Sequence, residues 1–147
     1  MEGYFRLMAY SRADLLGLVG NLPDEALDWK PDPESLTLRR LLRHIGNAEE
    51  WYVSRLVPPE TLPPEWEHDE ALPLFEFLEM ERRTALDRLR RLSEPELGEV
   101  FYPARWAQHP GEPWTARKAL RRFLEHEREH TDQVREILAV YREAYRT

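Results

Sequence analysis

Apolar residues recur along this chain at intervals of three or four positions, which is the period of an amphipathic α-helix. Four segments carry this pattern, and no segment alternates convincingly with the period of two that a half-buried strand shows. The four segments are residues 2–19, 38–56, 72–92 and 115–145. Because there are no strands for them to cover, the helices must bury their apolar faces against one another. The pattern therefore predicts an all-α four-helix bundle.

Proline and short polar residues separate the predicted helices. Pro58 and Pro59 stop the second helix, and Thr115 is a suitable N-cap for the fourth. The third and fourth helices follow long connections. Residues 57–70 are acidic and rich in proline, whereas residues 94–113 form an irregular segment with several aromatic side chains.

Composition narrows the class of protein. The chain has 147 residues, which suits a single domain over residues 1–147. Its net charge of -7 argues against nucleic acid or anionic membrane as a partner, because their phosphates would repel it. There is no run of about 18 apolar residues that could span a bilayer, and the first residues lack the plan of a signal peptide. We therefore expect a cytoplasmic protein.

The absence of cysteine restricts the chemistry that the chain can perform. Without cysteine there are no disulfides, zinc ribbons or thiolate nucleophiles. Any bound metal must be held by nitrogen and oxygen ligands. If the reaction involves a thiol, that thiol must belong to a substrate or a cosubstrate.

Two of the five histidines lie four residues apart on the fourth predicted helix. This spacing places His126 and His130 on one face, where both rings can reach one metal ion at about 2.0–2.1 Å. The pair also lies within the apolar arc, where an imidazole is costly unless it is hydrogen-bonded or metal-bound. Taken alone, the pair fits a metal site and two satisfied structural histidines equally well.

A third histidine changes this balance. His44 flanks the apolar stripe of the second helix and can reach the other two if the second and fourth helices are neighbours. Three histidine ligands leave a coordination position open, as in catalytic metal sites, whereas structural sites are usually closed by four protein ligands. We therefore predict a metal centre formed by His44, His126 and His130. His68 and His109 lie in connections and are expected at the surface.

Residues 126–130 also satisfy the pattern H-E-x-x-H of zinc metalloproteases. The residues after His130 continue the same helix, so no later helix can supply a third ligand, and this argues against a peptidase. Glu127 still lies on the inward arc of the helix. It would contact a metal-bound water, pair with an inward arginine, or extend from the edge of the arc into solvent.

Arg82 lies on the otherwise apolar face of the third predicted helix. It would bind a substrate carboxylate, or form a buried ion pair with Glu127 or Glu79. The walls of a pocket beside the metal are expected from Trp51, Tyr52, Tyr4 and Ser11, with aromatic contributions from Phe101, Tyr102 or Trp106.

Three stretches of the chain carry a family resemblance. Residues 22–31 are similar to a segment between the first two helices, and residues 38–51 to a second helix that carries a metal-binding histidine. Residues 126–134 are similar to a last helix in which two histidines four apart precede a glutamine. On these stretches the chain resembles the DinB/YfiT-like family of metal-dependent enzymes.

The resemblance implies an up-down-down-up bundle that often forms a homodimer. It also implies a divalent ion on His44, His126 and His130, commonly nickel or zinc, with manganese and iron as further candidates. Characterised relatives include thiol-dependent transferases and isomerases that use bacillithiol or mycothiol.

Together these observations favour a metal-dependent enzyme that acts on a small molecule. Transfer of a low-molecular-weight thiol is the leading hypothesis, and metal-assisted hydrolysis is its variant. Glu127 and Arg82 are the candidate catalytic residues. The rival interpretation is a non-enzymatic, dimeric helical bundle whose metal site is structural or vestigial.

Overall fold

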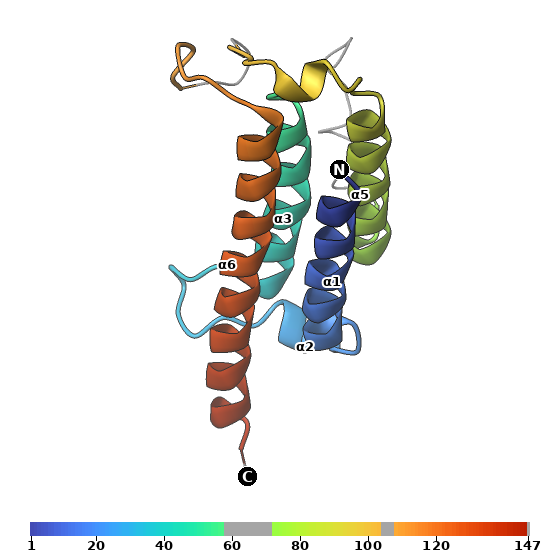
Figure 1. Ribbon diagram of the computed structural model, residues 1–147. Helices are drawn as coiled ribbons and strands as arrows, with labels where there is room; N and C mark the ends of the chain where they lie inside the picture. The colour runs from blue at the N-terminus through green and yellow to red at the C-terminus, as the bar shows by residue number, and fades with distance from the viewer. Residues whose placement is uncertain (58–71, 104–107, 147) are drawn as a thin grey trace. The chain divides into compact units, whose positions relative to one another are not determined.

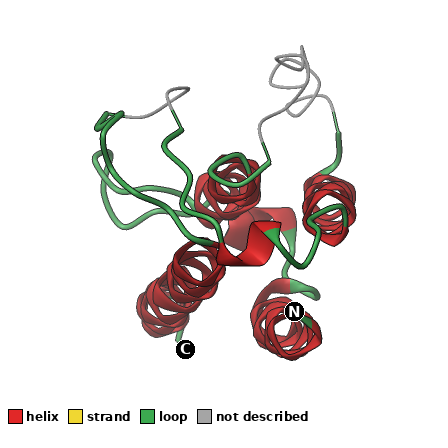
Figure 2. Cartoon of the chain, turned by 45° about the horizontal axis from the view of Figure 1, so that its top comes forward, coloured by secondary structure: helices red, strands yellow, loops and turns green. Residues whose placement is uncertain are grey.

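The structure, a computed structural model, is built from helices. It describes residues 1–57, 72–103 and 108–146. The elements are α1 (Glu2–Val19), α2 (Asp24–Leu27), α3 (Leu38–Val53), α5 (Leu74–Arg90), the 3₁₀ helix η1 (Glu96–Gly98) and α6 (Ala116–Ala144) (Figure 1). Within the described residues no strand forms (Figure 2), and the nearest feature is an isolated bridge between Phe101 and Trp114.

Side-chain caps fix the starts of two helices. The Thr37 hydroxyl accepts a hydrogen bond from the Arg40 backbone N–H at 3.1 Å and so begins α3. The Thr115 hydroxyl accepts one from the Lys118 N–H, also at 3.1 Å, and begins α6. The predicted N-cap of the fourth helix is thus confirmed.

The chain divides into two compact units. One contains Met1–Ile45 and Leu124–Thr147, and the other contains Gly46–Phe123. Helices α3 and α6 contribute residues to both units. Among the described residues, no helix combines the length and apolar character needed to cross a membrane.

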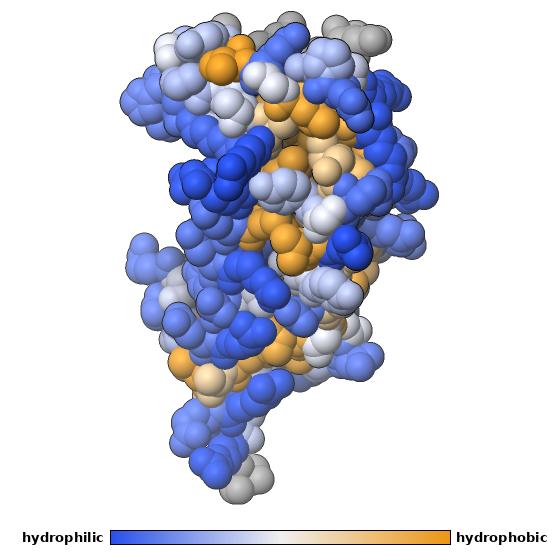
Figure 3. Space-filling view, viewed as in Figure 1, coloured by the Kyte–Doolittle hydropathy of each residue, from blue (hydrophilic) through white to orange (hydrophobic). Residues whose placement is uncertain are grey.

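The first unit joins α1, α2, the start of α3 and the C-terminal part of α6. Within it, α1 runs parallel to α6 and antiparallel to the start of α3 (Figure 1). Hydrophilic side chains predominate at the surface of the lower part of the view in Figure 3, with a few apolar side chains among them. The buried apolar residues are Met8, Leu15, Val19, Ala26, Leu27, Leu38, Leu41, Leu42, Ile45, Val134 and Leu138.

The second unit joins the end of α3, all of α5 and the start of α6. Here α3 and α5 run parallel, and the start of α6 is antiparallel to both (Figure 1). Gly46 allows α3 to approach α5 closely, because a Cβ atom at this position would lie 2.4 Å from Cε1 of the buried Phe77. Two buried or half-buried ion pairs, Glu49–Arg82 and Glu50–Arg88, also link α3 to α5.

Candidate metal centre

Three histidine side chains meet within the first unit. His126 and His130 are one turn apart on α6, and His44 comes from α3. The His126 Nε2 atom lies 3.0 Å from Nε2 of His44 and 3.1 Å from Nε2 of His130. The ring centroid of His44 lies 4.9 Å from the ring centroid of each of the other two histidines. The tertiary structure therefore brings together the three residues that the sequence singles out.

The histidine cluster lies partly at the surface. His44 is exposed, whereas His126 and His130 are half-buried. Partial desolvation, followed by the neighbouring His130, lowers the pKa of His44. A lowered pKa keeps this imidazole neutral, with a free lone pair, near neutral pH.

Gln133 defines the protonation pattern of His130. Its amide oxygen lies 2.9 Å from Nδ1 of His130. His130 precedes Gln133 by about one turn of α6. Because an amide oxygen only accepts hydrogen bonds, Nδ1 carries the proton and donates it to Gln133. In the neutral ring the lone pair then lies on Nε2 of His130, and this is the atom that faces His126.

The three histidines fit a divalent cation. Two metal–nitrogen bonds of about 2.1 Å that meet at about 90–110° hold their nitrogen atoms about 3.0–3.4 Å apart. The observed Nε2 separations of 3.0 and 3.1 Å lie in this range. A neutral imidazole has only one N–H group, and that of His130 points at Gln133. Hydrogen bonds between the rings therefore do not fully explain why the three Nε2 atoms lie so close together. An all-imidazole ligand set suits zinc, nickel, copper or iron.

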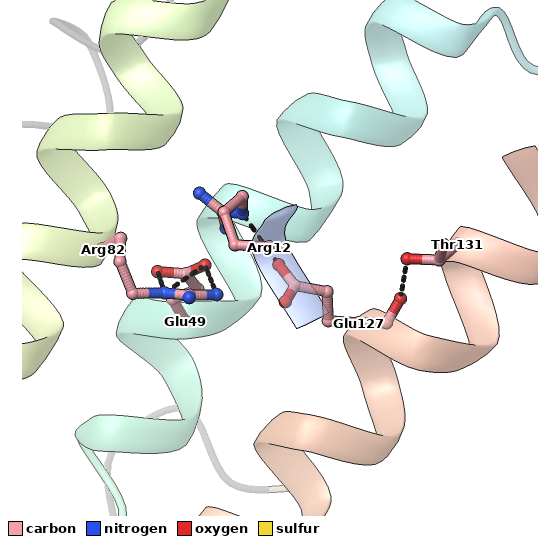
Figure 4. Close-up of polar contacts among 5 residues, drawn as sticks. All are labelled: Arg12, Glu49, Arg82, Glu127 and Thr131. Atoms are coloured by element: carbon pink, nitrogen blue, oxygen red, sulfur yellow. Dashed lines mark hydrogen bonds and ion pairs between the residues drawn. The ribbon is translucent and has the colours of Figure 1, made fainter. Parts of the chain in front are cut away.

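Glu127, next to His126, is engaged by an arginine from α1. Its Oε2 atom accepts a hydrogen bond from Nε of Arg12 at 2.9 Å, and both side chains are almost fully buried (Figure 4). The Thr131 hydroxyl donates to the Glu127 backbone carbonyl at 2.7 Å. Of the roles considered for Glu127, the pair with an inward arginine matches the geometry. A catalytic role for this residue stays a prediction.

A second contact joins α1 and α6 at the same level. Arg128, which follows Glu127, donates to Asp14 at 2.5 Å, and both side chains are about half exposed. Two consecutive residues of α6 are therefore tied to α1 immediately after His126. Such links set the rotation of α6 about its axis, and with it the direction in which His126 and His130 project.

Arg82 forms its buried ion pair within the second unit. Its Nη2 atom lies 3.0 Å from Oε1 of Glu49, and its Nε atom lies 3.2 Å from both carboxylate oxygens (Figure 4). Its guanidinium also lies 5.2 Å from the ring centre of Phe123. The sequence points to Glu127 or Glu79 as partner and does not single out Glu49. The one feature of the sequence that could have pointed to Glu49 is its position four residues after Ile45, which places it on the buried face of α3.

The predicted pocket residues lie in different units. Tyr4 is half-buried and Ser11 is buried on α1, in the first unit. The Ser11 Oγ atom has no hydrogen-bond partner among the described residues. Trp51 and Tyr52 belong to the second unit, where Trp51 packs edge-on against Trp114 with ring centres 5.7 Å apart. Their role as pocket walls stays a prediction.

Other candidates lie at the surface or outside the described residues. Tyr102 and His109 are exposed, whereas Phe101 exchanges backbone hydrogen bonds of 2.7 and 2.8 Å with Trp114. The surface position expected for His109 is thus confirmed. Trp106 and His68 lie outside the residues that the structure describes.

Comparison with known proteins identifies the family. The model of the DinB superfamily matches residues 7–134, which is most of the chain. The chain belongs to the DinB superfamily. No curated protein sequence matches it significantly.

The fold of this DinB-superfamily chain has a counterpart among solved structures. YfiT from Bacillus subtilis matches with a TM-score of 0.65 and 18% sequence identity, over 92% of this chain and 84% of YfiT. YfiT is described as a probable metal-dependent hydrolase with an unusual four-helix bundle topology. At this identity the likeness concerns the fold. It confirms the four-helix bundle predicted from the sequence, and the helix directions within each unit agree with the up-down-down-up order.

Proposed function

We propose that this chain is a divalent-metal-dependent enzyme that acts on a small molecule, with His44, His126 and His130 as the metal ligands. The observation that carries the proposal is the convergence of three Nε2 atoms, with contacts of 3.0 and 3.1 Å, at the exposed side of the first unit. Three protein ligands leave room for an external ligand, as in catalytic sites.

The three proposed ligands would not themselves offset the charge of a bound divalent ion. All three ligands are neutral imidazoles, and the nearby carboxylate of Glu127 is balanced by Arg12. A bound divalent ion would supply a Lewis acid that lowers the pKa of a thiol or water held in the open position. An anionic external ligand is therefore favoured at this site.

Thiol transfer is the reaction that we propose first. The chain has no cysteine, so the nucleophilic sulfur must come from a low-molecular-weight cosubstrate. In the transfer, the sulfur bonds to an electrophilic carbon of the substrate, the leaving group departs with its bonding electron pair, and the thiol proton passes to solvent. None of these steps requires a general base from the protein beyond the ionised thiol.

Hydrolysis is the second candidate, because the structurally similar YfiT is described as a probable metal-dependent hydrolase. Water then takes the place of the thiol as nucleophile. A hydrolase benefits from a general base near that water, and the nearby acidic residue Glu127 has its carboxylate engaged by Arg12.

Metal analysis followed by a turnover assay tests the proposal. Protein purified without a histidine tag should hold close to one divalent ion per chain, and His44→Ala should remove it while the helical circular dichroism persists. His109→Ala, a change at an exposed histidine, should keep the ion. Metal-dependent consumption of an electrophile only when a thiol is added supports transfer, and ester cleavage without thiol supports hydrolysis.

Two results would count against the enzyme. If removal of the metal unfolds the protein, the ion is structural, and this result supports the rival interpretation of a non-enzymatic bundle. If the metal binds but neither thiol transfer nor hydrolysis depends on it, an enzymatic role fails. The identity of the ion, the homodimer and the cytoplasmic location are predictions that these measurements leave for separate tests.

A further inference from the structure

Gln133 is a half-buried polar residue on α6, one turn after His130. Its amide oxygen lies 2.9 Å from Nδ1 of His130, while Nε2 of the same ring lies 3.1 Å from Nε2 of His126. The two ring nitrogens of His130 therefore face different groups. One nitrogen contacts an obligate hydrogen-bond acceptor, and the other faces the histidine cluster.

We propose that Gln133 is a positioning residue that fixes the tautomer and orientation of His130 for metal binding. This inference rests on the three-histidine metal centre proposed above, and it adds a residue outside the ligand set. The amide oxygen holds the proton on Nδ1, and this leaves the lone pair of Nε2 aimed at the position shared with His126 and His44.

The physical reason lies in the tautomers of neutral histidine. Without a partner at Nδ1, an imidazole side chain prefers to carry its proton on Nε2. In that form the cluster would face an N–H group, and a metal could bind only after the ring had changed tautomer. A partner on the non-ligating nitrogen removes this step and locks the ring angle, and its loss commonly weakens metal binding about 10- to 100-fold.

The helix itself makes Gln133 suitable for this role. Residues three apart on an α-helix lie side by side, so Gln133 reaches His130 without a contribution from a loop. The partner atom is then held by the same element that carries His126 and His130. Because an amide is neutral, it also orients the ring without adding the negative charge that a carboxylate would bring to the centre.

The first test reads the tautomer directly in the metal-free protein. Nitrogen-15 NMR of the histidine rings should show His130 with its proton on Nδ1 in the unaltered chain. In Gln133→Met, which keeps the length of the side chain but has no strong acceptor, the proton should move largely to Nε2. A His130 ring that already carries its proton on Nε2 in the unaltered chain overturns the proposal, whether or not the variant folds.

The second test measures binding of Zn²⁺ alone by titration calorimetry. Gln133→Met should weaken zinc binding about 10- to 100-fold, and Gln133→Glu, which restores an acceptor, should recover most of that loss. Gln108→Met is the matched control, since Gln108 is an exposed residue in the connection before α6; it should bind as the unaltered chain does. Equal zinc affinity in Gln133→Met and the unaltered chain contradicts the proposal.

The two tests separate this inference from the proposed function. If the unaltered chain binds no divalent ion, the metal-dependent function fails, and the role of Gln133 in metal binding fails with it. If the chain binds zinc tightly but Gln133→Met changes neither the His130 tautomer nor the affinity, only the role of Gln133 is lost. A merely structural role for Gln133 predicts a lower melting temperature with an unchanged tautomer, and this result also rejects the proposal.

Discussion

Gly46 shows how one small residue sets the distance between two helices. A Cβ atom there would lie 2.4 Å from Cε1 and 2.9 Å from Cζ of Phe77, whose ring is fully buried and has little room to move. By contrast, a Cβ atom at Gly17 of α1 would have no neighbour within 4 Å. The two glycines therefore have opposite requirements, although both are helical.

We expect Gly46→Ala to destabilise the protein by up to about 2 kcal/mol. The better helix propensity of alanine, about 1 kcal/mol, is outweighed by overpacking against Phe77. Gly17→Ala is the matched control and should leave stability unchanged or raise it by up to about 1 kcal/mol. Urea denaturation of both variants measures the difference. A Gly46→Ala variant as stable as Gly17→Ala would show that α3 and α5 adjust freely.

The start of α6 depends on the hydroxyl of Thr115, which caps the Lys118 N–H at 3.1 Å. Thr115→Ala should lower the free energy of unfolding by about 1 kcal/mol, because the backbone donor loses its partner. Thr115→Ser keeps the hydroxyl and should stay close to the unaltered stability. Equal losses in the two variants, measured by thermal denaturation, would mean that the methyl group matters and the cap does not.

At the scale of elements, the ion pair Arg12–Glu127 connects α1 to the turn of α6 that begins at His126. The two side chains are 10% and 3% exposed, so removal of one partner leaves a charge in a poorly solvated position. The pair therefore acts both on the packing of the two helices and on the placement of the histidine cluster.

Arg12→Met should destabilise the protein by about 3–5 kcal/mol, because Glu127 would keep its buried charge without Arg12. The double variant Arg12→Met with Glu127→Gln should recover much of this loss, since no charge stays behind. Urea unfolding measures both values. If the double variant is as unstable as the single one, the cost comes from the lost packing of Arg12 and not from the buried charge of Glu127.

Helix ends were the part of the elements that periodicity predicted least well. The first helix was placed correctly at residues 2–19, and α6 ends one residue earlier than expected. The end of α3 falls at Val53, three residues before the predicted one. There the Trp51 carbonyl accepts hydrogen bonds from the side chains of Ser54 at 2.6 Å and Arg55 at 3.2 Å. Side chains thus replace the backbone donor that would have continued the helix.

A very short helix cannot be predicted from the periodicity of apolar residues. The helix α2 has four residues, too few for an apolar repeat to be seen, and yet it buries Ala26 and Leu27 in the first unit. Its existence depends on the Pro23 that precedes it and on packing against the longer helices.

At the scale of the molecule, metal binding should be visible as stability. A ligand that binds only the folded chain stabilises it by about 2.7 kcal/mol at a hundredfold excess over its dissociation constant, which for a chain of this size raises the melting temperature by about 5–10 °C. We expect this shift with Zn²⁺ or Ni²⁺ and its loss in His44→Ala. Mg²⁺, which prefers oxygen ligands, is the control and should cause no shift. An equal shift with Mg²⁺ would point to general charge screening of an acidic protein.

The sequence by itself determined the four long helices, and it predicted the type of ligand at the candidate site. The 3.6-residue period, the caps and the spacing of His126 and His130 are local properties, so they can be read from neighbouring residues. The absence of cysteine and the presence of three histidines predict a metal site with nitrogen ligands in the same way.

Only the tertiary structure decided which distant residues meet. The approach of His44 to His126, and the choice of Arg12 for Glu127 and of Glu49 for Arg82, join residues 33 to 115 positions apart. Such pairings depend on the rotation and offset of packed helices, and several partners along a helix are equally compatible with the period of the sequence. The packing of the helices removes this ambiguity, because each buried charge must find a partner within reach.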